Sequence, residues 1–228
     1  MTEISQASAP SSDVRSPGVV LLHGIARTSR SLTKFETALR ASGFATLNLD
    51  YASRRKPLAT LAADIHPEIS EFANTTVQIH FVAHSMGGLL TRVYVARYRP
   101  AALGRVVMLG TPNGGSEIAD LLRGLSLYRA FYGPAGQQLT TVRDPDLTSL
   151  PPPDYDVGII AGISSIDPIA SRFILPRPND GRVSVQSAKL ANMTDYTTVK
   201  ASHTGLVRHR VAIAQTIALL RDGRFLAS

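Results

Sequence analysis

The chain has 228 residues, of which 44% are hydrophobic and 18% charged, and its formal net charge is +7 at pH 7. This length suits a single domain with one sizeable core, and the composition is that of a globular protein. No stretch approaches the ~18 consecutive apolar residues that a membrane-spanning helix needs, so we expect no integral membrane segment. The absence of cysteine excludes disulfides and cysteine nucleophiles.

Residues 1–17 are polar and rich in Ser and Pro, without the basic start and apolar stretch of a secretory signal. We interpret them as a flexible tail before one domain over residues 18–228, and we expect a cytoplasmic protein unless a leader has been removed. The basic residues are spread along the chain, and their only tight run is Arg54-Arg55-Lys56. This distribution favours a solvated basic surface over a nucleic-acid interface.

Short runs of strand composition alternate with stretches of helical spacing along the chain. Several runs are apolar at consecutive positions, which is typical of strands covered on both faces. The strand candidates are residues 19–22, 45–49, 79–83, 105–109, 157–161 and 196–200. The helical stripes begin at Leu32 after a candidate N-cap at Ser31, at Leu58, at Leu89 and at Leu206. The alternation predicts an α/β fold: a mostly parallel sheet of about six strands with helices on both faces.

The segment from about residue 116 to 153 breaks this alternation with Gly-Pro, Asp-Pro and Pro-Pro-Pro sequences. A long irregular segment inside a compact domain is more often a lid or a binding loop than a simple connector. We therefore expect a small cap or lid-like insertion there, and the sequence leaves open whether it moves.

Ser85 stands between the third apolar run and a helical stripe, in the sequence Ala83-His84-Ser85-Met86-Gly87. This is the G-x-S-x-G nucleophile elbow with Ala83 in place of the first glycine, and alanine is still small enough for the close packing that the turn requires. A plain serine N-cap is the alternative, but it requires neither a preceding strand nor small residues on both sides. The pattern indicates that Ser85 is a nucleophile.

Four segments together resemble bacterial lipases and esterases of the α/β-hydrolase superfamily. They are residues 22–25, 83–87, 109–116 and 179–183. The Ala-His-Ser-x-Gly elbow is similar to that of small, lidless bacillus-type lipases, and the matching pieces run from about residue 18 to 222. The resemblance implies an α/β-hydrolase fold and hydrolysis of acyl esters without a cofactor.

A serine hydroxyl needs a base to remove its proton, and the base needs a carboxylate to orient it. In this fold the order along the chain is Ser, then acid, then His. Only His203 and His209 follow the elbow. His203 comes directly after the sixth strand candidate, whereas His209 falls within the last helical stripe between two arginines. We therefore predict that His203 is the base.

Asp180 is the predicted acid, because it follows the fifth strand candidate close to where the resemblance places the acid of the family. The Asn-Asp-Gly turn that contains it is also a common loop element without chemistry. Asp167 and Asp195 remain alternatives, since both follow the elbow and flank strand ends. For the oxyanion hole we predict the backbone N–H groups of Met86, after the nucleophile, and of Ile25, after the first strand.

Two other chemistries are less well supported by the sequence. Four histidines precede Ser85 in the chain: His23, His66, His80 and His84. They lack the spacing of metal ligands, so we predict no metal site. We expect His84 to pack beneath the elbow. Ser31 and Lys34 match the S-x-x-K motif of penicillin-binding proteins, yet no Lys-Thr-Gly element follows.

The sequence therefore predicts a serine carboxylic ester hydrolase, an esterase or lipase without a cofactor, that acts on small-molecule or lipid esters of short to medium chain length. The alternatives are an acyltransferase, thioesterase or amidase with the same residues, or a non-catalytic binding protein with a hydrolase fold. We expect no nucleic-acid partner. The sequence does not determine the oligomeric state, and a monomer is the default.

Overall fold

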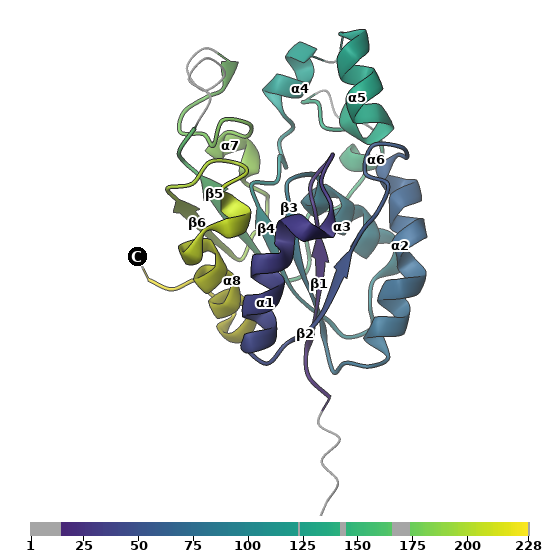
Figure 1. The fold of residues 1–228 in the computed structure, drawn as a ribbon, viewed down its shortest axis with the longest axis vertical. Helices are drawn as coiled ribbons and strands as arrows, with labels where there is room; N and C mark the ends of the chain where they lie inside the picture. The colour runs from purple at the N-terminus through teal and green to yellow at the C-terminus, as the bar shows by residue number, and fades with distance from the viewer. Residues whose placement is uncertain (1–14, 123, 142–144, 166–173, 228) are drawn as a thin grey trace, which may run out of the picture.

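The computed structural model describes residues 15–122, 124–141, 145–165 and 174–227. Its centre is a six-stranded sheet in the order β2-β1-β3-β4-β5-β6, in which every neighbouring pair is parallel (Figure 1). The strands are β1 (Gly18–Leu22), β2 (Ala45–Leu49), β3 (Ile79–His84), β4 (Leu103–Leu109), β5 (Val157–Gly162) and β6 (Asp195–Val199). The predicted parallel sheet of six strands is confirmed.

Helices cover both faces of the sheet, and the strand sequences explain why. Side chains alternate across a strand, so Val20 and Leu22 pack into one core with α2 and α3, whereas Val19 and Leu21 pack into a second core with α1 and α8 (Figure 1). All four side chains are fully buried, which is why the strand has no polar positions. The helices are α1 (Thr33–Ala41), α2 (Leu58–Ala73), α3 (Met86–Tyr98) and α8 (Arg210–Asp222).

Two helix starts differ from the sequence prediction. A 3₁₀ turn, η1 (Ser29–Leu32), precedes α1, and the Ser31 hydroxyl donates to the Thr28 carbonyl oxygen instead of capping the helix. The predicted N-cap at Ser31 is therefore wrong: the carboxylate of Asp50 accepts hydrogen bonds from the N–H and hydroxyl of Ser29 and so holds the start of the 3₁₀ turn. A second 3₁₀ turn, η3 (Leu206–Arg208), likewise precedes α8.

The segment that breaks the alternation contains short helices, and α4 and α5 lie beyond the carboxyl ends of the strands as a cap (Figure 1). The helices are α4 (Glu117–Leu122), α5 (Ser126–Gln137) and α6 (Pro145–Thr148), and α7 (Val185–Ala188) follows β5. A kink at Gly133, with φ 61°, divides α5, and a Cβ there would overlap the carbonyl oxygen of Arg54. The cap therefore rests directly on the loop after β2.

Residues 15–17 of the predicted tail contact the domain. The Arg15 guanidinium donates to the Asn74 carbonyl oxygen, and the Pro17 carbonyl oxygen accepts a hydrogen bond from the Ala45 N–H. Residues 1–14 lie outside the described part of the chain. Among the helices that the structure describes, none has both the length and the apolar character needed to cross a membrane.

His80 in β3 makes the stability of the fold dependent on pH. Its side chain is 2% exposed, and its Nδ1 lies 2.8 Å from the backbone N of Arg105, which donates to it. Burial, assisted by the positive charge of Arg105, lowers the pKa of His80 from 6.5 to about 4. The folded protein therefore favours the neutral ring.

We expect the free energy of unfolding to fall by up to about 1.4 kcal/mol per pH unit, on account of His80, as the pH drops from ~6.5 towards ~4. In this interval the unfolded chain binds the proton more tightly than the folded one, so the contribution of His80 is complete above it. Urea unfolding of the wild type and His80→Gln at several pH values isolates this contribution, because the other histidines titrate in both proteins. Identical pH slopes for the two proteins would contradict the prediction.

Candidate active site

Ser85 alone forms the turn between β3, which ends at His84, and α3, which begins at Met86. Its backbone has φ 55° and ψ −125°, a conformation that L-residues rarely adopt and that costs about 1–3 kcal/mol. The following glycines let the helix approach the sheet: a Cβ on Gly87 would lie 2.4 Å from the Leu22 carbonyl oxygen. A strained, tightly packed turn thus presents the Ser85 hydroxyl at the carboxyl edge of the sheet.

Ser85, His203 and Asp180 form a continuous chain of hydrogen bonds. His203 Nε2 lies 3.0 Å from Ser85 Oγ, and His203 Nδ1 lies 2.8 Å from Asp180 Oδ2. Because an ionised carboxylate only accepts hydrogen bonds, Nδ1 carries the proton and Nε2 presents its lone pair to the hydroxyl. This is the tautomer that a general base requires.

Asp180 is held in place by backbone groups. Its side chain is buried, and its Oδ1 accepts the N–H groups of Arg182 at 2.9 Å and Val183 at 2.8 Å. Its own carbonyl oxygen accepts the N–H of His203 at 2.9 Å. The buried carboxylate is therefore hydrogen-bonded through both oxygens, as a buried charge must be.

The structure places the alternative candidates elsewhere or does not describe them. Asp195 begins β6, so it lies at the amino edge of the sheet, where its Oδ2 accepts the N–H of Phe225 at 2.7 Å. His209 precedes α8 instead of lying within it, and His203 occupies the position beside Ser85. Asp167 lies outside the described residues.

His84 supports the backbone of the predicted base. It is 4% exposed, and its Nε2 lies 3.0 Å from the carbonyl oxygen of His203. Burial is the main cause that holds the pKa of His84 well below its usual range, so the neutral ring donates this hydrogen bond through Nε2–H. The sequence predicted that His84 packs beneath the elbow, but it did not reveal this contact with His203.

The predicted oxyanion-hole amides flank Ser85. The N–H of Met86 is the first of α3, where helical amides have no intrahelical partner. Ile25 lies in a tight turn closed by a hydrogen bond of 3.2 Å from the Arg27 N–H to the Gly24 carbonyl oxygen. Within the described residues, neither the Ile25 nor the Met86 N–H has a hydrogen-bond acceptor. Both groups are therefore available to a ligand.

Two residues that the sequence analysis missed hold the turn that contains Ile25. Ser53 is 5% exposed, and its Oγ accepts the N–H of Ala26 at 3.1 Å. The Tyr51 ring stacks on His23 with a centroid distance of 4.1 Å, and its hydroxyl donates to the His23 carbonyl oxygen. Burial raises the pKa of Tyr51, so the hydroxyl stays a donor. The only sequence signal was their place directly after β2.

A cavity of about 350 Å³ opens at Ser85. The cap supplies an apolar wall that consists of Ile118, Ala119, Leu122, Phe131, Tyr132 and Leu139. The turn at Ile25 and the side chains of Arg27 and Arg182 form other parts of its lining. An apolar wall beside a few convergent polar groups is typical of a small-molecule site.

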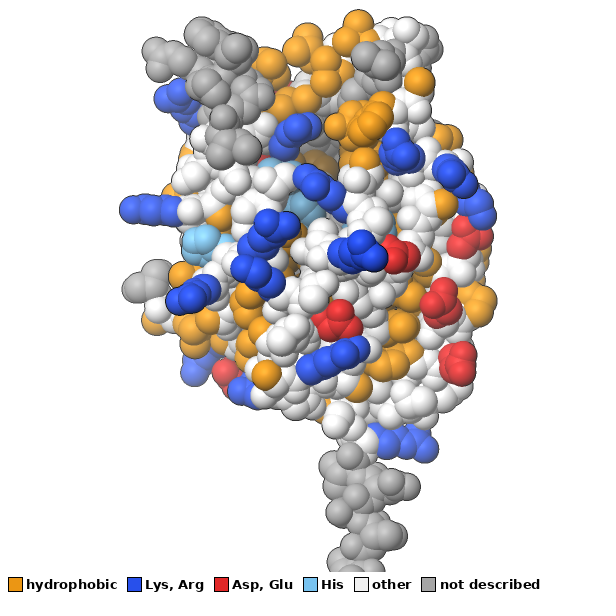
Figure 2. Space-filling model, in the orientation of Figure 1, with side chains coloured by type: hydrophobic (Ala, Val, Ile, Leu, Met, Phe, Trp, Pro, Cys, Tyr) orange, Lys and Arg blue, Asp and Glu red, His pale blue; other side chains and the backbone are white. Residues whose placement is uncertain are grey.

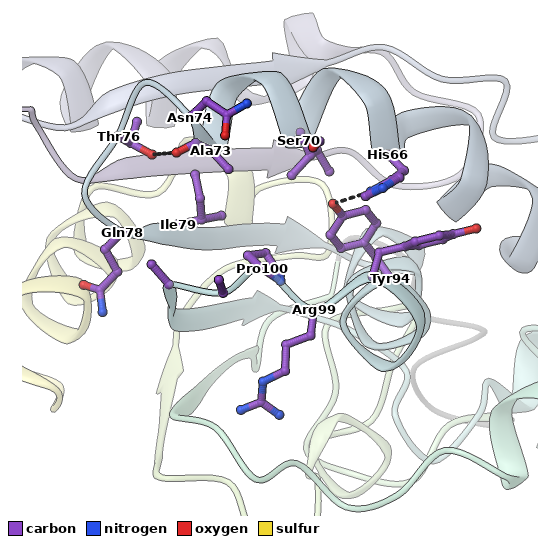
Figure 3. Close-up of a pocket in the computed structure, with 14 residues that line it drawn as sticks. His66, Ser70, Ala73, Asn74, Thr76, Gln78, Ile79, Tyr94, Arg99 and Pro100 are labelled. Carbon is purple, nitrogen blue, oxygen red and sulfur yellow. Dashed lines mark hydrogen bonds between the residues drawn. The ribbon is translucent and has the colours of Figure 1, made fainter.

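A second cavity, of about 310 Å³, lies between α2, α3 and the start of β3 (Figure 3). There the Nδ1 of His66 lies 3.2 Å from the Tyr94 hydroxyl, and its ring stacks on Tyr98. This cavity does not include Ser85, and it borders the amino end of β3, whereas ligands of α/β sheets usually bind outside the carboxyl ends. In the described part of the chain, no cluster of three His, Cys, Asp or Glu side chains could hold a metal ion.

Comparison with known proteins decides the family. A family model described as alpha/beta hydrolase family matches residues 19–214. The chain belongs to the alpha/beta hydrolase family. Among solved structures, this hydrolase is similar to the mature form of a lipase from Bacillus licheniformis, with a TM-score of 0.72 and 20% identity over 96% of each chain.

Two further structures share the fold of this α/β hydrolase. A metagenomic carboxyl esterase matches with a TM-score of 0.66 and 20% identity over 88% of this chain and 70% of its own. The thioesterase of the prodiginine biosynthetic pathway of Streptomyces coelicolor matches with a TM-score of 0.56 and 14% identity over 96% of this chain and 90% of its own. The family resemblance predicted from the sequence is confirmed.

We expect Gly87→Ala to destabilise the hydrolase by about 1–3 kcal/mol, because the new Cβ would lie 2.4 Å from the backbone oxygen of Leu22, which cannot move without distorting β1. Gly124→Ala is the matched control, since a Cβ there has no atom within 4 Å, and its effect should stay within about 0.5 kcal/mol. Urea unfolding measures both. Equal stabilities for the two variants would contradict the close approach of α3 to β1.

Proposed function

We propose that this α/β hydrolase is a serine carboxylic ester hydrolase, an esterase or lipase that acts through an acyl-enzyme on esters of short to medium chain length. The observation that carries the proposal is the hydrogen-bonded chain from Ser85 through His203 to Asp180, beside two backbone amides without an acceptor. The structural neighbours named as a lipase and a carboxyl esterase support it.

In the first half of the reaction, Ser85 Oγ attacks the ester carbonyl carbon while its proton passes to His203 Nε2. Asp180 stabilises the resulting imidazolium, and the N–H groups of Ile25 and Met86 donate to the oxyanion of the tetrahedral intermediate. The bond from carbon to the leaving oxygen then breaks, and His203 returns the proton to that oxygen. An alcohol departs and the acyl group stays on Ser85.

In the second half, a water molecule attacks the acyl-enzyme, and His203 takes its proton. The intermediate collapses with cleavage of the bond to Ser85 Oγ, which recovers the proton from His203. The products are a carboxylic acid and an alcohol. The proton transfers between Ser85 and His203 join atoms 3.0 Å apart, and the proposed reaction requires no cofactor.

The apolar wall of the cap is the natural place for the acyl chain. Phe131 and Leu122 come from α5 and α4, and the cavity of about 350 Å³ suits a small or medium acyl group better than a long one. A hydrolysis series of p-nitrophenyl esters from acetate to palmitate gives the optimum. An optimum at palmitate would contradict the chain length that we propose.

Thioester hydrolysis is a second candidate, because a thioesterase is among the structural neighbours and the same residues support acyl transfer from a thiol. Rates on matched butyryl esters and thioesters distinguish the two activities. Product analysis with added alcohols or amines separates hydrolysis from acyl transfer. Failure of a fluorophosphonate to label Ser85 in the folded protein would instead indicate a non-catalytic binding protein.

We expect Ser85→Ala to lower ester turnover by on the order of 10⁴ to 10⁶, as removal of the nucleophile does in comparable sites. Ser70→Ala is the control: Ser70 is exposed on α2, beside the cavity that does not include Ser85, and its removal should leave the rate unchanged. The measurement is steady-state hydrolysis of p-nitrophenyl butyrate. A rate within tenfold of the wild type for Ser85→Ala would contradict the proposal that Ser85 is the nucleophile.

We expect Ser53→Ala to lower kcat about tenfold with little change in KM, because Ser53 orients the turn that carries the Ile25 N–H without touching the substrate. A donor that points at the transition-state oxyanion affects the chemical step more than ground-state binding. Steady-state kinetics and thermal unfolding are measured together. A lower melting temperature with an unchanged kcat would show a purely structural role for Ser53.

A further inference from the structure

Arginines gather at the mouth of the active-site cavity, although they are far apart in the sequence. Arg27 follows the oxyanion turn, Arg182 follows the predicted acid, and Arg208 ends η3 a few residues after His203; all three are exposed. Figure 2 shows blue side chains crowded around the hollow below the apolar cap, whereas the red carboxylates lie mostly lower and towards the right edge. On this face, the charges are therefore more segregated than the sequence indicated.

A pocket of about 250 Å³ lies next to the active-site cavity, and we call it the arginine pocket. Its lining consists of Arg27, Ser31, His84, Thr204, Val207 and Arg208. Three of these residues, Arg27, His84 and Thr204, also line the cavity at Ser85, so the two spaces adjoin. A group bound in the arginine pocket therefore adjoins the cavity that opens at Ser85.

The lining of the arginine pocket contains two guanidinium groups and no carboxylate. In the part of the chain that the structure describes, neither Arg27 nor Arg208 forms an ion pair with an acidic side chain. Asp50, which packs against the neighbouring η1, already accepts hydrogen bonds from Ser29. The two positive charges therefore face the pocket without a counter-charge from its lining.

The two sides of the active-site mouth differ in chemistry. The cap side is apolar through Ile118, Leu122 and Phe131, whereas the side formed by η1 and η3 carries the arginine pocket. The planar fork of N–H donors on a guanidinium group matches the geometry of the oxygens of a carboxylate or a phosphate. A substrate with an apolar chain at one end and an anion at the other complements both sides.

We infer that the arginine pocket is a subsite for an anionic group, a carboxylate or a phosphate, carried by the ester substrate. The inference rests on the proposed ester hydrolysis. It makes Arg27 and Arg208 determinants of substrate specificity and gives them no part in the proton transfers.

The test compares anionic and neutral esters of matched shape. An anion on the acyl group is examined with 4-nitrophenyl hemiglutarate against 4-nitrophenyl pentanoate. An anion on the alcohol is examined with 1-butyrylglycerol 3-phosphate against 1-butyrylglycerol. We expect the wild type to prefer the anionic member of at least one pair in kcat/KM, and Arg208→Gln to reduce that preference about tenfold, the loss of a charge-assisted hydrogen bond at a partly exposed site.

Two matched variants separate a local subsite from general attraction of anions. Arg55→Gln removes the same charge from a neighbouring depression outside the arginine pocket. Arg224→Gln removes it just after α8, at the amino edge of the sheet, where Arg105 of β4 contacts the end of that helix. Both should leave the preference unchanged. An equal loss in Arg55→Gln and Arg208→Gln that disappears at about 0.5 M salt would overturn the inference, because only screened surface charge would be acting.

Absence of any anionic preference in the wild type would also overturn the inference while leaving ester hydrolysis intact. If the wild type hydrolyses none of the four esters, the proposed function fails, and the subsite is judged by thermal unfolding with inorganic phosphate. A phosphate-induced rise in melting temperature that Arg208→Gln abolishes and Arg224→Gln keeps supports the subsite. Equal rises in the two variants would refute it.

Discussion

The close approach of α3 to the backbone of β1 is the constraint on which the candidate active site is built. Gly87 faces the carbonyl oxygen of Leu22, and Gly88 faces Thr111 so closely that a Cβ would lie 2.1 Å from its hydroxyl oxygen. This contact forces the chain to turn within the single residue Ser85, at a positive φ. The strain there is offset by the burial of β3 in both cores and of α3 in one of them.

The same edge of the sheet supplies the partners of Ser85, and glycines again create the space. A Cβ on Gly110 would lie 3.1 Å from Asp180 Oδ2, and one on Gly162 would lie 2.8 Å from the Asp180 Cβ. Gly110, just after β4, and Gly162, at the end of β5, thus leave room for a carboxylate that is hydrogen-bonded through both oxygens. His203 is fixed through its ring by Asp180 and through its carbonyl oxygen by His84, so the proposed base has little freedom to turn away from Ser85.

The mouth of the site combines two recognition surfaces of opposite character. The cap contributes apolar side chains from a segment that kinks at Gly133 to rest on the loop after β2. The loops after β1 and β6 contribute arginines. Hydrophobic contact is non-directional, whereas a guanidinium fork fixes both the position and the orientation of an anion. Together the two surfaces would hold the apolar end and the anionic end of a substrate, so that the ester carbonyl between them lies at Ser85.

Local patterns in the sequence were sufficient for the strands, for the main helices and for the strand-to-helix turn at Ser85. A strand buried on both faces must be apolar at consecutive positions, and the elbow needs small residues at fixed offsets, so both leave their signature within a few residues. The order along the chain favoured His203 as the base, and the resemblance to the family favoured Asp180 over Asp167 and Asp195 as the acid. Their meeting at one edge follows from the parallel sheet, whose carboxyl strand ends all face the same way.

The features that escaped the sequence analysis depend on contacts between distant segments. Ser31 is of a residue type that often caps helices, but Asp50, directly after β2, holds a 3₁₀ turn there instead. Ser53 and His84 act on backbone groups that only folding brings to them. The basic residues looked evenly spread because Arg27 and Arg208 are 181 positions apart (208 − 27), yet they line one pocket. Periodicity records which face of its own element a residue occupies, and only the packed structure decides which residue it meets.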